Sequence, residues 1–307
     1  MIECIFTLDY EIYGNGTGSL KELVYEPAER LRELFLKFDA RFVAFIEAAE
    51  LEKIEACGSD RAIDAVKRQV RQLHKQGFEI GLHLHPQWAN ARYERAQWAL
   101  DYSEYNLCTL PRARIAQIVG RSLDYLREIT GQPAFVPLAF RAGNWLFQPA
   151  KTAAAVLAEY GIRIDSSVFK GGVQHRNRLD YRPALENGYY WRFSSNVSKP
   201  DPGGEWLEIP IYTRLVPCWT MATPKRLGFK NSAGGPAAGG ADQPARLGRI
   251  DRLRDLARLR YPRKLDFCRM TLHELTSTMN RVIQEDQRSP EAYKPIVAIG
   301  HTKDLTD

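Results

Sequence analysis

The alternation of short apolar runs with helix-period segments constrains the fold of this chain more than any other feature. The apolar runs are rich in β-branched and aromatic residues, and between them apolar residues recur at helical spacing. Such alternation is the pattern of βα units, whose strands run parallel in one sheet. It predicts an α/β fold with strands in residues 3–8, 41–46, 78–83, 139–140 with its flanks, 162–164, 206–211 and 296–299, and helices in residues 28–38, 61–75, 114–129 and 151–160.

The length and the absence of a linker indicate a single domain. A chain of 307 residues suits one large α/β domain or two small ones. No clean linker divides it, so we predict one domain over residues 1–307 that carries insertions. Residues 170–202 are expected to form loops and short strands over the site. Residues 230–244 are almost wholly Gly, Ala, Ser, Pro and Asn, which predicts a mobile surface loop.

The positive charge of the chain is concentrated in one segment. The net charge is +6, and the basic insertion at residues 246–264 contains eight Arg or Lys and two Asp, so the rest of the chain sums to about zero. Such a run is typical of a solvated helix face, and its functional alternative is a contact with a diphosphate-linked substrate or an anionic lipid surface. Nucleic acid is not expected as a partner, because the segment has few interleaved aromatic residues and no recognition motif.

The sequence predicts a cytoplasmic protein. Its N-terminus lacks the features of a signal peptide, and no apolar run approaches the roughly 18 to 20 residues that span a membrane. The five cysteines are scattered and form no CxxC pair, which argues against a disulfide framework and a zinc finger.

A capping-box pattern, Thr271-Leu-His-Glu274, predicts one more helix near the C-terminus. We interpret the apolar stripe that follows, and His273 beside it, as structural. The stripe consists of Leu272, Leu275, Met279, Val282 and Ile283.

Two histidines, two residues apart, end one of the predicted strands. In Glu79-Ile-Gly-Leu-His83-Leu-His85, an apolar run leads into both of them. Residues i and i+2 of a strand lie on one face, so both imidazoles can point at one metal ion. The alternative is a pair of histidines whose hydrogen bonds are satisfied within the fold.

Other polar residues follow the first and last predicted strands. Asp9 and Glu11 end the first strand, and His301 ends the last one. Acidic residues at strand ends are often caps or solvated turns, but the C-terminal ends of strands jointly form the site of an α/β barrel. Two carboxylates and three histidines at three strand ends therefore indicate a catalytic centre.

Two further strand ends carry Arg141 and Asp165. An arginine beside buried carboxylates would hold an anionic base in place and lower its pKa. Gly143, followed by Asn144, would let backbone N–H groups approach a substrate oxyanion. The aromatic residues beside these motifs, which either stack on sugar rings or belong to the core, are Tyr10, Trp88 and Trp145.

In their order along the chain, these motifs resemble those of the polysaccharide deacetylase family, carbohydrate esterase family 4 with its NodB homology region. The matching segments are Thr7-Leu-Asp-Tyr-Glu11, Glu79-Ile-Gly-Leu-His83, Phe140-Arg141-Ala-Gly, Asp165-Ser166 and Ile299-Gly-His301. The resemblance runs over nearly the whole chain. It implies a distorted (β/α) barrel, TIM-like, with inserted loops.

The resemblance also implies a metal-dependent hydrolase that removes an N-acetyl or similar acyl group from a sugar. The divalent metal, with zinc as the expected ion, would be held by Glu11, His83 and His85. The metal would polarise the acyl oxygen and acidify a water. The catalytic residues implied are Asp9 as base, Arg141 as its partner, His301 as general acid and Asp165 of the fourth motif.

The chain departs from the family pattern at two ligand positions. The family usually has adjacent aspartates in the first motif, whereas here Tyr10 follows Asp9 and Glu11 comes next. The family's second histidine stands four residues after the first, where this chain has Gln87. His85 is the preferred replacement because imidazole is a far better zinc ligand than an amide oxygen, with Gln87 and Asp9 as alternate ligands.

Several alternatives remain open at this stage. A cytoplasmic deacetylase would act on a nucleotide-linked or lipid-diphosphate-linked precursor of surface polysaccharide or O-antigen, near the inner face of the membrane. The chain could instead be a catalytically silent saccharide-binding homologue, or its histidines could be purely structural. Another barrel amidohydrolase acting on a C–N bond is disfavoured, since such enzymes carry the paired histidines on the first strand.

Overall fold

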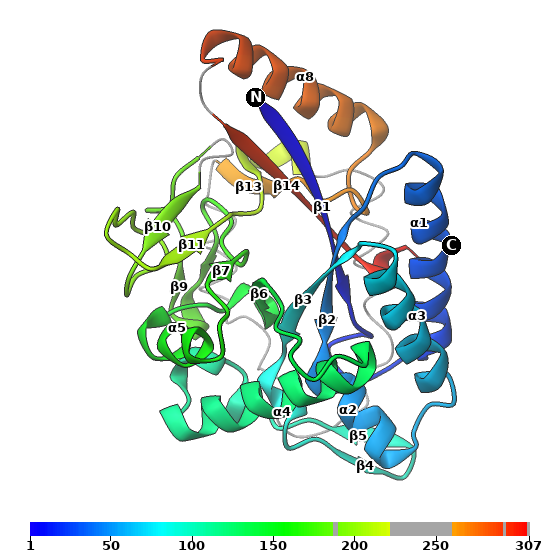
Figure 1. The fold of residues 1–307 in the computed structure, drawn as a ribbon. Coiled ribbons are helices and arrows are strands. Elements are labelled where there is room, and N and C mark those ends of the chain that lie inside the picture. The colour runs from blue at the N-terminus through cyan, green and yellow to red at the C-terminus, as the bar shows by residue number, and fades with distance from the viewer. Residues whose placement is uncertain (187–189, 222–259, 291–292, 306–307) are drawn as a thin grey trace.

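The computed structural model describes residues 1–186, 190–221, 260–290 and 293–305. In this part of the chain the centre is an eight-stranded sheet in the order β10-β11-β7-β6-β3-β2-β1-β14 (Figure 1). Neighbouring strands run parallel, except that β10 is antiparallel to β11. The strands are β1 (Ile2–Tyr10), β2 (Val43–Glu47), β3 (Glu79–Leu84), β6 (Ala139–Ala142), β7 (Ile164–Asp165), β10 (Trp191–Phe193), β11 (Trp206–Glu208) and β14 (Lys294–His301). Apart from β10, each of them matches a strand predicted from the apolar runs.

The sheet curls until its two ends meet. Ile211, just past β11, forms a parallel bridge with Val297 of β14. Tyr212 donates its backbone N–H to the Val297 carbonyl at 3.0 Å. On the same edge, Asp266 bridges Ile299. Isolated bridges thus close the seam instead of a continuous ladder, and the fold is the distorted (β/α) barrel that the sequence predicts.

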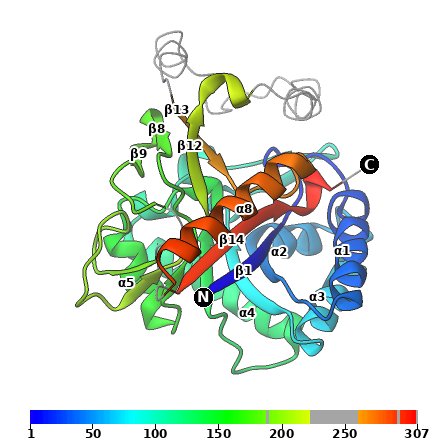
Figure 2. The same ribbon diagram turned by 90° about the horizontal axis from the view of Figure 1, so that it is seen from above.

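Helices cover the outside of the sheet (Figures 1 and 2). They are α1 (Glu26–Lys37), α2 (Ala48–Cys57), α3 (Ile63–Lys75), α4 (Arg112–Thr130), α5 (Ala150–Glu159) and α8 (Leu272–Arg288). A π-helical turn lies at Lys21–Tyr25, and 3₁₀ turns lie at Pro86–Trp88, Tyr102–Glu104, Leu107–Thr109, Gly143–Trp145, His175–Asn177, Cys218–Met221 and Thr302–Asp304. The predicted helices correspond to α1, α3, α4 and α5. Helix α2 is not predicted from the sequence, because it follows β2 at once and has no capping side chain at its start. No helix in the described residues is both long and apolar enough to cross a membrane.

Helix α8 begins where the capping box predicts. The Thr271 side chain accepts from the Glu274 N–H, and the Glu274 side chain accepts from the Thr271 N–H. The apolar stripe is only partly structural. Val282 is buried, but Leu272 is 80% exposed and Ile283 is 44% exposed, because the buried face of the helix passes through Glu274, Thr278 and Val282.

Among the described residues, three small antiparallel ribbons extend from the barrel. They are β4 (Arg92–Glu94) with β5 (Gln97–Ala99), β8 (Val173–Gln174) with β9 (Leu179–Asp180), and β12 (Thr213–Pro217) with β13 (Arg260–Lys264). Strands β8 to β10 account for the loops and short strands expected in residues 170–202. The end of the basic segment is the strand β13, so the expectation of a helix face is wrong for those residues. The predicted loop at 230–244 and the rest of the basic segment lie outside the described residues.

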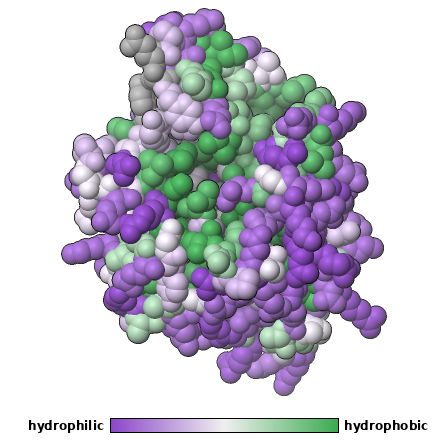
Figure 3. Space-filling model, in the orientation of Figure 1, coloured by the Kyte–Doolittle hydropathy of each residue, from purple (hydrophilic) through white to green (hydrophobic). Residues whose placement is uncertain are grey.

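Alternation along β1 and β3 separates the core from the barrel interior. Leu8 and Tyr10 belong to the main hydrophobic cluster beneath the helices. Asp9 and Glu11 point to the opposite side, as a period of two requires. In the space-filling view, hydrophilic side chains cover the flank formed by α1 and α3, and hydrophobic side chains gather towards the middle of the face (Figure 3).

Candidate metal and acid–base centre

The ends of two strands, β1 and β3, bring one carboxylate and two imidazoles together inside the barrel. The ligand atoms of Glu11, His83 and His85 all lie within 4.8 Å of one another, and all three side chains are buried. Glu11 Oε2 is 3.0 Å from His85 Nε2 and 3.6 Å from His83 Nε2. The curl of the sheet makes this contact, since β2 separates β1 from β3 in the sheet order.

The donor atoms of this cluster suit a divalent metal. His83 Nδ1 lies 2.8 Å from the Arg141 carbonyl, so Nδ1 carries the proton and donates it. When the ring is neutral, as in a metal ligand, the lone pair of His83 Nε2 faces the cluster, and this atom is buried without a hydrogen-bond partner. Two imidazole nitrogens and one carboxylate oxygen are a common zinc ligand set. A metal at this position would satisfy the otherwise unpartnered nitrogen.

A second set of contacts orients the ligands. The His85 backbone N–H donates to Glu47 Oε2 at 2.5 Å, and Lys303 Nζ lies 2.7 Å from Glu11 Oε1. The amides of Gln87 and Asn144 approach His85 Nδ1 at 3.1 and 3.3 Å. Gln87 therefore contacts the nitrogen on the far side of the His85 ring, which is an orienting position. Such partners fix the direction of a metal-binding imidazole.

Beside this cluster lies a carboxylate held by arginine. Arg141 Nη1 donates to Asp9 Oδ1 at 2.6 Å, and both side chains are buried. Asp9 Oδ2 is 3.4 Å from His301 Nε2, and Asp9, Glu11 and His301 form a second group of close ligand atoms. Arg141 is itself held by Ser166, through the carbonyl at 2.9 Å and the hydroxyl at 3.1 Å.

The electrostatics of this centre keep the two carboxyls ionised. Burial raises the pKa of Asp9, but Arg141 and the two nearby imidazoles outweigh it and hold that pKa below its ordinary value. Burial likewise opposes ionisation of Glu11, yet Lys303 and the histidines hold its pKa well below the ordinary range. Burial lowers the pKa of His301 despite the opposing charge of Asp9, so this imidazole is mostly neutral at neutral pH.

Asp165 does not lie among the reacting groups. Its carboxylate accepts from the Ser167 hydroxyl at 2.7 Å and from the Ser167 N–H at 3.2 Å, and it pairs with Glu208 on the next strand. The two close groups of metal-binding atoms found in the described residues do not include it. The expectation of a catalytic Asp165 is therefore corrected. Its place is in a buried acid pair, next in sequence to the Ser166 that holds Arg141.

Two of the predicted sugar-stacking residues are also corrected. Tyr10 is fully buried, and its hydroxyl bonds to Gln69 of α3. Trp88 is 1% exposed and packs against Trp98 with ring centroids 4.9 Å apart. Neither ring can reach a substrate, because each one fills the core.

Gly143, Asn144 and Trp145 do lie beside the centre. A Cβ on Gly143 would come within 2.6 Å of the Leu84 carbonyl oxygen and 2.7 Å of the His85 ring, so glycine is needed for close packing there. Asn144 and Trp145 have φ values of 54° and 60°, which are strained for residues with side chains. This backbone directs the Trp145 ring to His301, at 6.3 Å between centroids.

Several charged residues of the site are missed by the sequence analysis. Glu47 and Glu50 are buried next to the cluster, and burial raises the pKa of Glu47 to about 8. Glu47 ends β2, so the rule of polar strand ends would have found it. Lys303 follows His301 by two residues and offered the same signal. Lys264 offered no such signal, because in the sequence it is one of many basic residues in the segment 246–264.

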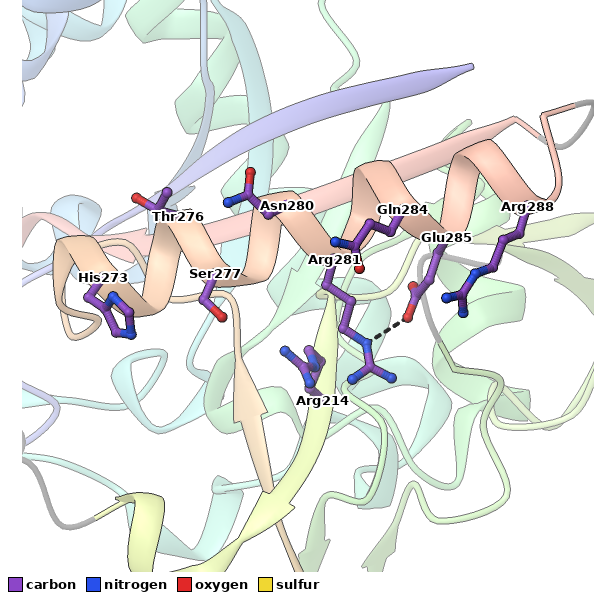
Figure 4. Close-up of a pocket in the computed structure, with 9 residues that line it drawn as sticks. All are labelled: Arg214, His273, Thr276, Ser277, Asn280, Arg281, Gln284, Glu285 and Arg288. Atoms are coloured by element: carbon purple, nitrogen blue, oxygen red, sulfur yellow. Dashed lines mark hydrogen bonds and ion pairs between the residues drawn. The ribbon is translucent and has the colours of Figure 1, made fainter.

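A separate polar cavity of about 620 Å³ lies along the outer face of α8 (Figure 4). The exposed His273 lines it, which agrees with a position outside the chemical centre. In the close-up, Arg281 pairs with Glu285 and Arg214 approaches from β12. The cavity shares no residue with the two clusters.

Comparison with known proteins gives likeness of fold only. No protein-family model matches the sequence, and no curated protein matches it. A protein named as a polysaccharide deacetylase from Mycobacterium smegmatis aligns with a TM-score of 0.46 and 13% identity, over 98% of this chain and 77% of that chain. The Puue allantoinase aligns with a TM-score of 0.46 and 15% identity, over 98% and 78% of the two chains. A family 4 carbohydrate esterase from Streptomyces lividans, solved with acetate, aligns with a TM-score of 0.33 and 15% identity, over 60% and 74%.

The similar structures include deacetylases, a family 4 carbohydrate esterase, an allantoinase and a mutant of a family 4 pseudoenzyme. At such identities and TM-scores, the likeness does not assign an activity to this chain. The assignment must come from the residues of the centre.

Proposed function

We propose that this protein is a metal-dependent hydrolase of the polysaccharide deacetylase type, which removes an acyl group from a saccharide nitrogen. One observation carries the proposal. A buried Glu11, His83, His85 cluster lies beside an Asp9 carboxylate that is held between Arg141 and His301. A saccharide-binding protein without catalysis needs no such adjoining base and imidazole.

The residues divide into ligands and proton carriers. Glu11, His83 and His85 would hold the metal, which when bound supplies Lewis acidity towards the acyl oxygen and makes water a stronger acid. Asp9, kept ionised by Arg141, accepts the proton of the attacking water. His301 is 3.4 Å from Asp9, so the proton has a short path to this imidazole and from there to the leaving amine. His301 starts mostly neutral, which suits it to receive that proton.

The first test is metal analysis of the purified protein, followed by assay on N-acetylated saccharides with added zinc or cobalt. We expect bound metal and hydrolysis that a chelator abolishes and zinc restores. The Asp9→Asn variant should keep its metal and lose turnover. Loss of the metal in that variant would mean that Asp9 is a ligand and Glu11 the base. Absence of both metal and restored hydrolysis would instead favour the silent saccharide-binding homologue.

We further propose a cytoplasmic site of action on a nucleotide-linked or lipid-diphosphate-linked saccharide, near the inner face of the membrane. The support is chemical. In the part of the chain that the structure describes, Cys4, Cys57 and Cys108 are free thiols, as is usual in a reducing compartment. The basic segment 246–264 would favour a diphosphate or an anionic lipid. A screen of N-acetylated nucleotide sugars tests the substrate, and salt-insensitive affinity would argue against the charged contact.

A further inference from the structure

Lys264 lies at the centre without being part of the chemistry described above. It ends β13 and pairs with Thr213 of β12, in the ribbon that stands beside β14 (Figure 2). Its Nζ is 3.1 Å from the centre of the Trp145 ring and 4.9 Å from that of Phe169. Trp145 in turn meets His301 edge-on. One aromatic ring therefore separates this ammonium from the proposed general acid.

The ammonium of Lys264 has no anionic partner in the described part of the chain. None of the ion pairs or hydrogen bonds there includes it, and its contacts are the two aromatic faces. The carboxylates that act on its charge are already engaged. Asp266 accepts from the backbone N–H groups of Cys268 and Arg269, and Asp9 is held by Arg141.

The surroundings of Lys264 disfavour its charge. Burial, together with Arg269 and Arg141, lowers the pKa of Lys264 to about 7, although Asp266 and Asp9 oppose the change. An ammonium without a counterion in such a place carries a desolvation cost that hydrogen bonds do not offset. A bound oxyanion would offset that cost and favour the charged form. Perturbed lysines of this kind gather at functional sites.

The backbone that carries Trp145 supports a functional reading of this contact. Asn144 and Trp145 both adopt left-handed conformations, and such strain persists where the surrounding structure enforces it. The strain presents one face of the indole to the ammonium. A lysine that only packed against the Trp145 ring would use its aliphatic stem, whereas Lys264 places its charged Nζ over that ring.

We propose that Lys264 binds an oxyanion, a carboxylate or a phosphate, carried by the saccharide next to the acylated nitrogen. This inference rests on the proposed function and narrows its substrate class to acidic or phosphorylated saccharides. Lys264 is then a specificity-determining residue, and Trp145 provides the surface on which the sugar and the ammonium meet.

The test is direct binding to the full chain in the presence of EDTA, so that no probe binds through a metal. The probes are N-acetylglucosamine, N-acetylglucosamine 1-phosphate and N-acetylmuramic acid, titrated by calorimetry into wild type, Lys264→Met and Lys264→Arg. We expect at least one anionic probe to bind wild type about tenfold more tightly than the neutral sugar, as charged hydrogen bonds typically allow. Lys264→Met should lose that preference, and Lys264→Arg should keep most of it. The exposed Lys151 of α5 gives a control, because Lys151→Met removes the same charge elsewhere.

The outcomes separate this inference from the proposed function. The probe that depends on Lys264 identifies the anion as phosphate or carboxylate. Equal affinities of all probes for wild type, no detectable anion binding, or unchanged preference in a folded Lys264→Met variant would overturn the inference. Turnover with zinc is measured separately on the same probes. A Lys264-dependent preference without hydrolysis would leave the anion site in place and reject the hydrolase.

Discussion

Replacing Glu208 by Gln tests whether the buried Asp165 and Glu208 pair holds a proton in the folded protein. Both side chains are fully buried, and the parallel register places them opposite one another on β7 and β11. Burial raises the pKa of both carboxyls, and the charge of Asp165 raises that of Glu208 further. The folded state therefore keeps a proton that the unfolded chain releases above the ordinary pKa of Glu.

The sign and size of the effect follow from proton linkage. When the folded state binds one more proton than the unfolded state, the free energy of unfolding falls as the pH rises. One proton corresponds to about 1.4 kcal/mol per pH unit, or about 2.7 kcal/mol between pH 5 and pH 7. The amide of the Glu208→Gln variant has no proton to release and can donate to an ionised Asp165. This part of the pH dependence should then disappear.

Urea unfolding at pH 5, 6 and 7 in EDTA measures the difference directly. Other buried acids, such as Glu47 and Glu50, contribute equally to the pH dependence of the free energy of unfolding in both proteins. Their contributions cancel in the difference between wild type and variant. Relative to the variant, wild type should lose about 2.7 kcal/mol of stability over this range. The control is Glu205→Gln, whose side chain is 77% exposed just before β11, and it should follow wild type. Parallel pH dependences of wild type and Glu208→Gln would refute the shared proton.

Two further variants test the proposed metal ligands. Lys303→Met should weaken zinc binding about 10- to 100-fold, since partners that orient a ligand typically contribute that much, and a competition assay with a chelating dye would detect it. Unchanged or tighter binding would show that Lys303 does not position Glu11. Gly143→Ala should lower both the melting temperature and the zinc affinity, because its Cβ would press on the His85 ring at 2.7 Å. Gly14→Ala, with nothing within 4 Å of the new Cβ, should leave both unchanged.

The strands and the members of the centre are predictable because each follows from a local signal. Asp9, His83 and His301 end apolar runs, and parallel strands bring their C-terminal ends to the same side of the barrel. The contacts between these side chains, which make them a site, do not follow from any local signal. Contact between Glu11 and His85 depends on the curl of the sheet across β2, which no spacing in the sequence encodes.

The errors have a common physical origin in the direction of side chains. Tyr10 and Trp88 adjoin catalytic motifs in sequence, yet the first points to the helix side of β1 and the second fills the core. The alternation of β1 was sufficient to predict the position of Tyr10, because its neighbours Asp9 and Glu11 point the other way. Trp88 lies in a 3₁₀ turn, where no simple period predicts its direction.

At the seam between β11 and β14, the chain leaves the barrel and returns to it at almost the same place. The chain leaves the seam at Tyr212 and returns at Leu265, where the Leu265 N–H donates to the Tyr212 carbonyl at 2.8 Å. Because exit and return are adjacent, the segment between them can change in length or sequence without altering the register of β14. That segment contains Lys264, whereas the proposed ligands and proton carriers lie outside it. We therefore expect homologues with different substrates to differ in the segment between Tyr212 and Leu265. The strand ends that carry the proposed ligands and proton carriers should stay the same.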